Sequence, residues 1–284
     1  MDLTEHDIVV AGRQLAYLES QGRGRPVVLV HGNSSSARTW RPLLDGPFGR
    51  QFCCLALDLP GHGRSAPPPQ PEDYCLPGYA DLLVRFARVS GAADAVFVGW
   101  NLGGHILLEA APALPDAAGF VIVGTPPVGS AEDLRRAFPS GPAMAAGFTA
   151  ELDEATARSC AERFVTAGSD HPLEEFVADI LATDGTARSA LGAGIGEGRF
   201  TDERAVVAGL TVPLAVLHGA GEQVVSLDYL RALTAPTLWR GEVQVIPGAG
   251  HAPHQETPDT FAALLTDFIA DVDRTAGPAA AGGA

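Results

Sequence analysis

The sequence predicts an α/β protein built on a mostly parallel, doubly wound sheet with an inserted helical cap. Short β-branched runs alternate with helical patterns, which is typical of repeated βαβ units. Most of the expected strands are continuously apolar, as parallel strands buried on both faces are. The chain has 284 residues, of which 46% are hydrophobic, and this is enough for a large core that carries an insertion.

The first strands should form an antiparallel hairpin over residues 7–19, which turns at Gly12-Arg13 and lies at the edge of the sheet. The buried strands are expected at residues 26–31, 53–58, 95–98, 120–123, 214–217 and 243–246. Helices are expected near residues 77–90, 102–113, 226–235 and 257–270. The core should therefore consist of residues 1–127 and 209–275.

Residues 128–208 break this alternation. They hold helical patterns separated by Gly, Pro and Asp and no convincing strand, so they are predicted to form a helical cap between the sixth and seventh strands. The tail at residues 276–284 contains only Ala, Gly and Pro. It is predicted to be disordered, because it has too little apolar surface to pack.

The charge balance limits the partners. The chain has 19 basic and 34 acidic residues, a formal charge of −15, and no basic run. Phosphate backbones and anionic membranes should repel it, so neither nucleic acid nor a membrane is expected as a partner. Every basic residue is Arg, which excludes Schiff-base lysines, pyridoxal phosphate attachment and a phosphate-loop lysine.

The cysteines predict no metal or redox site, and the N-terminus predicts no secretion signal. None of the four cysteines forms a CxxC pair, so neither a zinc site nor a redox pair is predicted. The first residues are polar and acidic, unlike a signal peptide, and no later run reaches membrane-spanning length. A cytoplasmic location is expected. The sequence gives no indication of the oligomeric state.

The strongest local motif is Gly99-Trp100-Asn101-Leu102-Gly103-Gly104, between an apolar strand and a helix. This is the setting of a nucleophile elbow, Gly-x-Ser-x-Gly, in which a strained turn exposes the central side chain. Here the central residue is Asn101. Asparagine tolerates positive φ better than most residues, so the turn itself should form.

Two partners follow in the order of a nucleophile, acid and histidine triad. Glu222 comes just after the strand that ends at Leu217, and His251 lies on a glycine-rich loop after the next strand. Histidine can take and return a proton near neutral pH, and Glu222 would fix its tautomer. The plainer interpretations are a solvated loop Glu and a loop His. The other histidines His31, His105 and His218 are predicted to be structural.

Two backbone N–H groups should form an oxyanion hole. They belong to Asn33, which follows the first parallel strand, and to Leu102, which follows the elbow. The candidate substrate-binding residues are Asn33, Trp100, Met144 and Phe148. Phe138 and Phe164 are further candidates for the pocket wall, although aromatic residues at helical spacing are more often plain core.

Five segments together resemble the α/β-hydrolase family across nearly the whole chain. These segments are residues 33–36, 58–65, 100–105, 125–127 and 250–253. Within the family, the chain is similar to the metal-independent N-acyl-homoserine-lactone lactonases, as residues 140–145 and 183–188 also indicate. The resemblance implies an ester or lactone substrate, an α/β-hydrolase fold and no cofactor; no HxHxDH zinc motif occurs.

The resemblance also implies a Ser-Glu-His triad. Glu222 matches its acid, because these lactonases have Glu at a position where Asp is the more common residue. The chain departs from this pattern at two places. Asn101 replaces the serine, and residues 156–160 lack the tyrosine that helps to bind substrate in those lactonases.

A carboxamide is not activated as a nucleophile by a neighbouring histidine, so four hypotheses stay open. His251 could activate water directly and give slow hydrolysis, or the chain could be a serine enzyme disabled at Asn101. His251 could instead act as the base of a lyase, cyclase or isomerase, or the chain could be a ligand-binding pseudoenzyme. Deamidation of Asn101 to an aspartate nucleophile is conceivable, although the bulky Leu102 should slow it.

Overall fold

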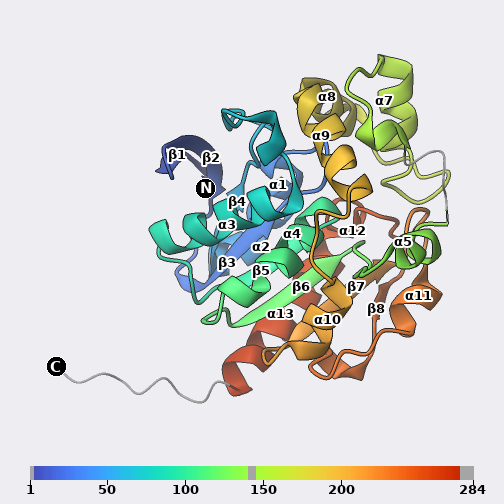
Figure 1. The fold of residues 1–284 in the computed structure, drawn as a ribbon. Helices are drawn as coiled ribbons and strands as arrows, with labels where there is room; N and C mark the ends of the chain where they lie inside the picture. Colours follow the sequence, from blue (N-terminus) through green and yellow to red (C-terminus); the bar gives the residue numbers. More distant parts are fainter. Residues whose placement is uncertain (1–2, 140–144, 276–284) are drawn as a thin grey trace.

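The computed structural model describes residues 3–139 and 145–275, which form an eight-stranded sheet between helices (Figure 1). The strand order is β1-β2-β4-β3-β5-β6-β7-β8, and every pair from β4 to β8 is parallel. The predicted fold class is therefore confirmed. The strands are β1 (Thr4–Val10), β2 (Arg13–Glu19), β3 (Gly24–Val30), β4 (Phe52–Leu57), β5 (Val96–Trp100), β6 (Gly119–Val123), β7 (Leu214–Gly219) and β8 (Gln244–Ile246).

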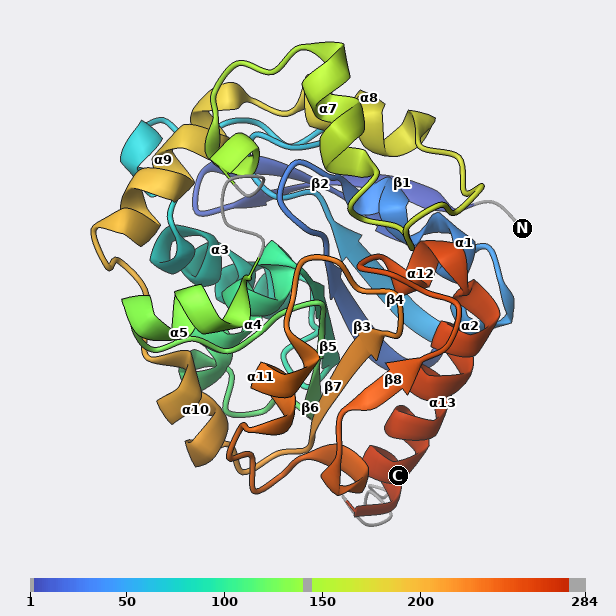
Figure 2. The same cartoon turned by 90° about the vertical axis from the view of Figure 1, so that its right-hand side faces the viewer.

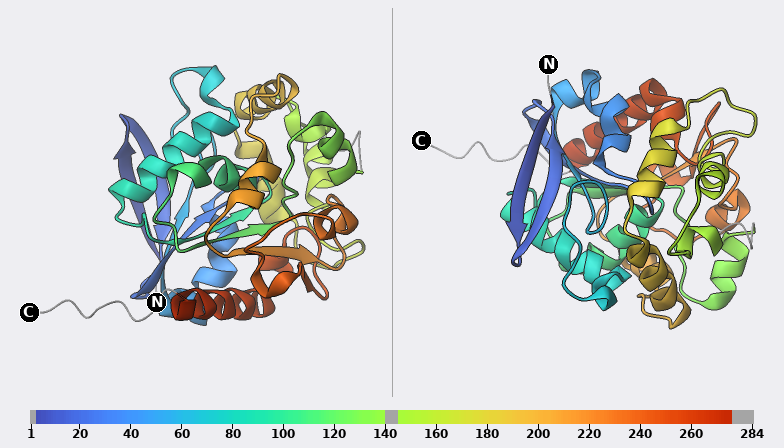
Figure 3. Two further views of the ribbon diagram at one scale, coloured as in Figure 1. Left: turned by 60° about the horizontal axis from the view of Figure 1, so that its bottom comes forward. Right: turned by 90° about the horizontal axis from the view of Figure 1, so that it is seen from above.

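The hairpin of β1 and β2 lies at one edge of the sheet, as predicted (Figure 3). Its turn falls at Ala11-Gly12, one residue before the predicted position, because Arg13 already pairs with Val10. Both turn residues have positive φ, 50° and 79°. Two-residue hairpin loops favour this geometry because its twist matches that of the strands.

Helices cover both faces of the sheet (Figure 2). One layer contains α3 (Leu76–Val89), α4 (Leu102–Ala110) and α10 (Glu203–Gly209), and the other contains α1 (Arg41–Leu44), α2 (Pro47–Gln51), α12 (Pro253–Glu256) and α13 (Pro258–Thr275). The central strand β3 contributes side chains to both layers. Val28 and Val30 pack towards the first layer, and Val27 and Leu29 pack towards the second. All four side chains are 0% exposed. This two-sided burial is why the strand is continuously apolar.

The segment between β6 and β7 is helical, and in the part that the structure describes it holds no strand. Its other helices are α5 (Ala131–Ala137), α7 (Glu154–Ala161), α8 (Glu174–Ala182) and α9 (Gly185–Gly196). Of the five α-helices that the structure describes in this segment, four begin after a residue whose side chain accepts a backbone N–H bond of the first turn, which fixes the start of a helix. These capping residues are Ser130, Asp153, Asp184 and Asp202.

Helices α7, α8 and α9 lie beyond the carboxyl ends of the parallel strands (Figures 1 and 2). Helix α10 crosses the predicted cap boundary at residue 208 and packs against the core helix α4, so that boundary stays a prediction. Met144 and the tail at residues 276–284 lie outside the described residues. Within residues 3–139 and 145–275, no helix is both long and apolar enough to cross a bilayer.

Two buried histidines hold the loops that follow β3 and β4. The Leu59 N–H donates to Nε2 of His31 at 3.0 Å, and the Ser34 N–H donates to Nε2 of His62 at 3.3 Å. Both bonds require an unprotonated Nε2. Burial lowers the pKa of His31 to about 4; burial and, secondarily, the neighbouring His31 lower the pKa of His62 to about 3.

We expect the free energy of unfolding to fall as the pH drops from 7 to 5. Both histidines take up a proton near pH 6.5 in the unfolded chain but stay neutral when folded, so protons favour unfolding throughout this window. Each should contribute a loss of about 2 kcal/mol. Urea unfolding at the two pH values measures this loss. A His62→Asn variant should show a loss that is smaller by about 2 kcal/mol, and equal stability of the native protein at pH 7 and 5 would contradict the prediction.

Candidate active site

The turn between β5 and α4 places Asn101 at the carboxyl edge of the sheet. Asn101 has φ 53° and ψ −117°, a strained conformation that asparagine accepts more readily than most residues. The Asn101 N–H donates to the Val123 carbonyl at 2.9 Å, and the Thr125 hydroxyl donates to the Asn101 carbonyl at 2.8 Å. The turn is thus bonded to the end of β6 and the residues after it.

Two glycines allow this turn to approach its neighbours. A Cβ on Gly99 would lie 2.5 Å from the Gly103 carbonyl, and a Cβ on Gly103 would lie 2.2 Å from the Val30 carbonyl. Any larger residue at either position would have to displace backbone. The spacing of the motif therefore reflects the close packing of β3, β5 and α4 around the turn.

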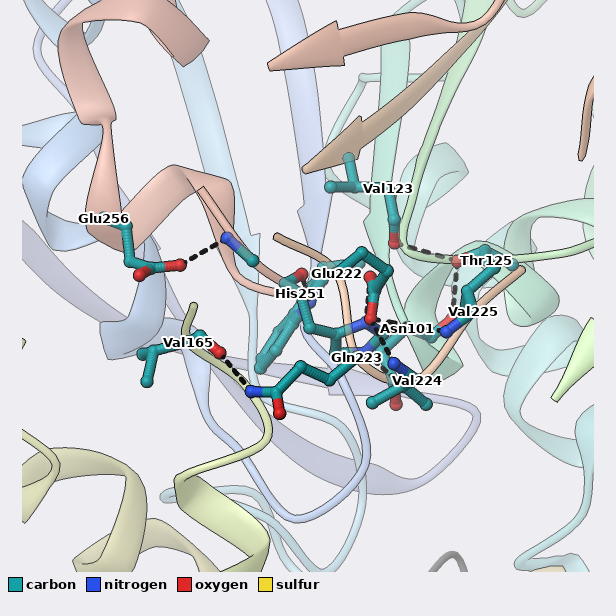
Figure 4. Close-up of polar contacts among 12 residues, drawn as sticks. Asn101, Val123, Thr125, Val165, Glu222, Gln223, Val224, Val225, His251 and Glu256 are labelled. Atoms are coloured by element: carbon teal, nitrogen blue, oxygen red, sulfur yellow. Dashed lines mark hydrogen bonds and ion pairs between the residues drawn. The ribbon is translucent and has the colours of Figure 1, made fainter. Parts of the chain in front are cut away.

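The structure brings Asn101, Glu222 and His251 together (Figure 4). His251 lies between the other two: its Nδ1 is 2.7 Å from Oε2 of Glu222, and its Nε2 is 2.8 Å from Nδ2 of Asn101. The side chains of His251 and Glu222 are 0% and 1% exposed. Three segments that are distant along the chain thus form one buried hydrogen-bonded row.

Glu222 is an ionised acceptor in this row. Its second oxygen, Oε1, accepts from the Val224 N–H at 2.6 Å and from the Val225 N–H at 3.3 Å. Burial alone would raise the pKa of this carboxyl, but its interaction with His251 and the hydrogen bond from the Val224 N–H outweigh burial, so the pKa is lowered. An ionised Glu222 can only accept, so Nδ1 of His251 carries a proton.

The carboxamide of Asn101 fixes the other ring nitrogen. The Asn33 N–H donates to Oδ1 of Asn101 at 3.2 Å, so Nδ2 is the atom that faces His251. Since Nδ2 can only donate, Nε2 of His251 is an unprotonated acceptor. This is the tautomer of a general base. The reverse placement of the amide would put its NH₂ group against the Asn33 N–H, two donors facing each other.

The Asn101 side chain is therefore hydrogen-bonded both to one predicted oxyanion donor, the Asn33 N–H, and to Nε2 of His251. The second predicted donor, the Leu102 N–H, belongs to the first turn of α4, where amides have no acceptor within the helix. The Asn33 side chain points elsewhere: its Nδ2 donates to the Gly147 carbonyl at 2.7 Å. Asn33 thus connects the loop after β3 with the helical segment between β6 and β7.

A cavity of about 400 Å³ opens next to Asn101. This size is in the range of small-molecule pockets. The wall of the cavity includes Asn33 and Phe148, two of the candidate substrate-binding residues, and also Asn101, Leu102, Phe138 and Phe164. The remaining wall is mainly apolar and includes Leu76, Leu134, Leu152, Ile180, Leu191 and Val224.

Trp100 does not belong to this wall, which corrects its assignment as a substrate-binding residue. Its side chain is 0% exposed, and its indole N–H donates to the His251 carbonyl at 2.7 Å. Alternation along β5 explains the difference, because successive side chains point to opposite faces of a strand. Trp100 thus stabilises the loop that carries His251 from the buried side.

His251 is also separated from the cavity. Asn101 stands between its Nε2 and the space, and Phe164 stacks on the ring with centroids 5.9 Å apart. A ligand in the cavity thus meets the carboxamide of Asn101 before it meets the imidazole.

His105 and Glu203 both lie in the cavity wall, although the sequence predicts a structural role for His105 and gives no signal for Glu203. Nδ1 of His105 is 2.8 Å from Oε1 of Glu203, whose side chain is 0% exposed. The position of His105 near the start of the helix that follows Asn101 could have indicated this location. His218 and His254 are buried, and burial lowers the pKa of each. Within the described ranges, no three His, Cys, Asp or Glu side chains are grouped to hold a metal ion.

Comparison with known proteins identifies one matching family and a similar esterase. Residues 27–264 match the profile of the Alpha/beta hydrolase family. A pimeloyl-[acyl-carrier protein] methyl ester esterase from Stenotrophomonas maltophilia (strain R551-3) is 31% identical over 261 residues, 89% of this chain and 96% of the relative.

Two similar solved structures belong to one lactonase. A mutant of the N-acyl homoserine lactonase AidH, complexed with N-hexanoyl homoserine lactone, has a TM-score of 0.90 and 37% identity over 95% of this chain and 99% of that one. AidH complexed with N-butanoyl homoserine has a TM-score of 0.89 at the same identity of 37%, over 95% and 97%. A thermophilic esterase from Thermogutta terrifontis with bound malate has a TM-score of 0.78 at 23% identity, over 95% and 99%, a likeness of fold alone.

Proposed function

Because this chain belongs to the alpha/beta hydrolase family, we propose that it binds a carboxylic ester or lactone and hydrolyses it slowly. The resemblance in the sequence to this family and to its lactonase branch is confirmed by the comparisons. The observation that carries the proposal is the hydrogen-bonded row of Glu222, His251 and Asn101 beside the cavity.

The proposed substrate is a small molecule with an apolar acyl part, similar to an N-acyl-homoserine lactone. The cavity of about 400 Å³ and its mainly apolar wall support a ligand of this kind. The similarity to AidH, solved with N-hexanoyl homoserine lactone, and to a methyl ester esterase supports an ester or lactone bond as the reacting group. Cys160 lies in the wall and belongs to the segment 156–160, which lacks the tyrosine of the lactonases.

In the proposed mechanism, His251 activates water. The side chain of Asn101 first turns away from Nε2, which opens the imidazole to a water molecule. Nε2 takes one proton from this water while its oxygen attacks the carbonyl carbon of the substrate. Glu222 stabilises the imidazolium that forms. The Asn33 and Leu102 N–H groups stabilise the oxyanion. When the carbon–oxygen bond to the alkoxide breaks, the imidazolium returns its proton to the leaving oxygen.

This mechanism is tested with N-hexanoyl homoserine lactone in ¹⁸O-labelled water. We expect slow formation of the ring-opened acid with one labelled oxygen, and an unmodified protein mass after acid quenching during turnover. An acyl adduct on the protein would contradict attack by water. Conversion without uptake of label would instead favour the lyase, cyclase or isomerase hypothesis, in which His251 abstracts a proton from the substrate.

A second candidate function is ligand binding without turnover. It is favoured by the position of Asn101, which occupies both Nε2 of His251 and the Asn33 N–H. Binding of the lactone without any product, with the same Kd in a His251→Ala variant, would support this function over slow hydrolysis.

A further inference from the structure

We propose that His105 and Glu203 form a polar subsite in the cavity, at which Nε2 of His105 hydrogen-bonds an amide or hydroxyl group in the acyl part of the substrate. The inference rests on the proposed function and defines its substrate class more narrowly. It departs from the prediction that His105 is structural.

The first observation is a buried carboxylate beside the cavity. Glu203 is 0% exposed and lies in the cavity wall. Its Oε2 accepts from the Val128 N–H at 2.8 Å, and Nδ1 of His105 lies 2.8 Å from Oε1 and 3.0 Å from Oε2. A carboxylate is costly to bury and is retained where its partners compensate it. His105 is its side-chain partner here.

The second observation is the free side of the imidazole. Because a carboxylate only accepts, the Nδ1 of His105 that faces Glu203 carries a proton. This leaves Nε2, for which the described residues offer no hydrogen-bond partner. The His105 side chain is 15% exposed and lies in the cavity wall. Nε2 accepts from an N–H or O–H when the ring is neutral and donates to an oxygen when it is protonated.

The third observation is the position of His105 relative to the reacting bond. His105 lies near the start of α4, four residues after Asn101, which precedes the helix, and both residues lie in the cavity wall. A substrate carbonyl held next to Asn101 would place the acyl part of the substrate in the same cavity as His105. The amide nitrogen of an acyl-homoserine lactone is bonded to the carbon next to its lactone carbonyl, so the amide lies close to the reacting bond. Phe138, 6.2 Å from the His105 ring between centroids, would flank the chain beyond it.

The alternative explanation is purely structural: the pair of His105 and Glu203 would serve only to connect α4 with α10 and with the segment at Val128. The two explanations differ in what they predict for ligands. A structural connection would affect all ligands alike, whereas a polar subsite would affect only ligands that carry the polar group.

The test uses N-hexanoyl homoserine lactone and a butyrolactone with an alkyl chain of equal length in place of the acylamino group. Calorimetry should give a Kd at least about tenfold lower for the amide lactone in the native protein, the difference of about one good hydrogen bond. In His105→Phe this preference should fall to about twofold or less, while the Kd of the alkyl lactone stays the same. His105→Gln, which can still hydrogen-bond, should restore part of the preference.

Glu109→Gln is the matched control. Glu109 is a half-buried carboxylate on the same helix that accepts from the Thr201 N–H at 2.8 Å, but it is not among the residues of the cavity wall. Its variant should keep the native preference. An unchanged preference in His105→Phe, or an equal loss of both ligands, would overturn the subsite and leave the proposed function intact. If the native protein neither binds nor hydrolyses either lactone, the proposed function fails and the subsite with it.

Discussion

Replacing Asn101 with serine should raise the rate of ester or lactone hydrolysis by about a thousandfold or more. Loss of the serine nucleophile lowers kcat by about 10⁶-fold in a well-studied serine protease. The remaining rate is still about 10³–10⁴-fold above that of the uncatalysed reaction in water. The base, its acid and the oxyanion donors already stand around residue 101, with Nε2 of His251 next to the side chain. A shorter serine would also leave the Asn33 N–H free for the substrate. The ratio of kcat/KM between the two proteins measures this gain.

Asn101→Ala separates the nucleophile from mere access. It removes the carboxamide that stands between His251 and the cavity, but it supplies no nucleophile, so its rate should stay far below that of Asn101→Ser. A serine-directed phosphonate should label Asn101→Ser and neither of the other two proteins. A flat response of Asn101→Ser, with the fold intact, would show that the arrangement no longer serves acyl transfer, and ligand binding would become the better explanation.

The sheet could be predicted because burial on both faces leaves a strong pattern. Each of the buried strands shows as a short apolar run, and the predicted and observed bounds differ by two residues or fewer. The shift of the hairpin turn to Ala11 could not be predicted from the pattern, since glycine at the next position suits either register. There, pairing between Val10 and Arg13 decided the outcome.

The triad could be predicted because its members occupy the loops after β5, β7 and β8, and parallel strands bring those loops to one edge. The contact between Asn101 and the Asn33 N–H could not, because it depends on the direction of one amide. Trp100 was misplaced because a neighbour of an exposed residue can point into the core. Glu203 was missed because a glutamate near the start of a helix is usually solvated, and only the packing of α10 against α4 buries it.

His251→Ala should abolish the residual hydrolysis of the native protein, a loss of about 10²–10⁴-fold for a general base. The variant should still fold, because the Trp100 indole bonds the main-chain carbonyl of residue 251 and not its ring. Initial rates with the same lactone, and a thermal unfolding scan for each variant, measure both effects. In the Asn101→Ser background, the same substitution should remove nearly the whole gain, since residues that act as a unit are not additive.

Glu222→Gln provides the sharper form of this prediction, because it changes the tautomer of His251 and little else. The amide oxygen of glutamine can still accept from the Val224 N–H, as Oε1 of Glu222 does at 2.6 Å. Its NH₂ group would then face Nδ1 of His251 and make it an acceptor, which moves the ring proton to Nε2. A ring that carries its proton on Nε2 cannot take one from water there. Hydrolysis should fall by about 10²-fold or more, with no comparable change in the Kd of the lactone. Full activity in this variant would mean that Nε2 of His251 is not the base, since the substitution leaves the cavity wall untouched.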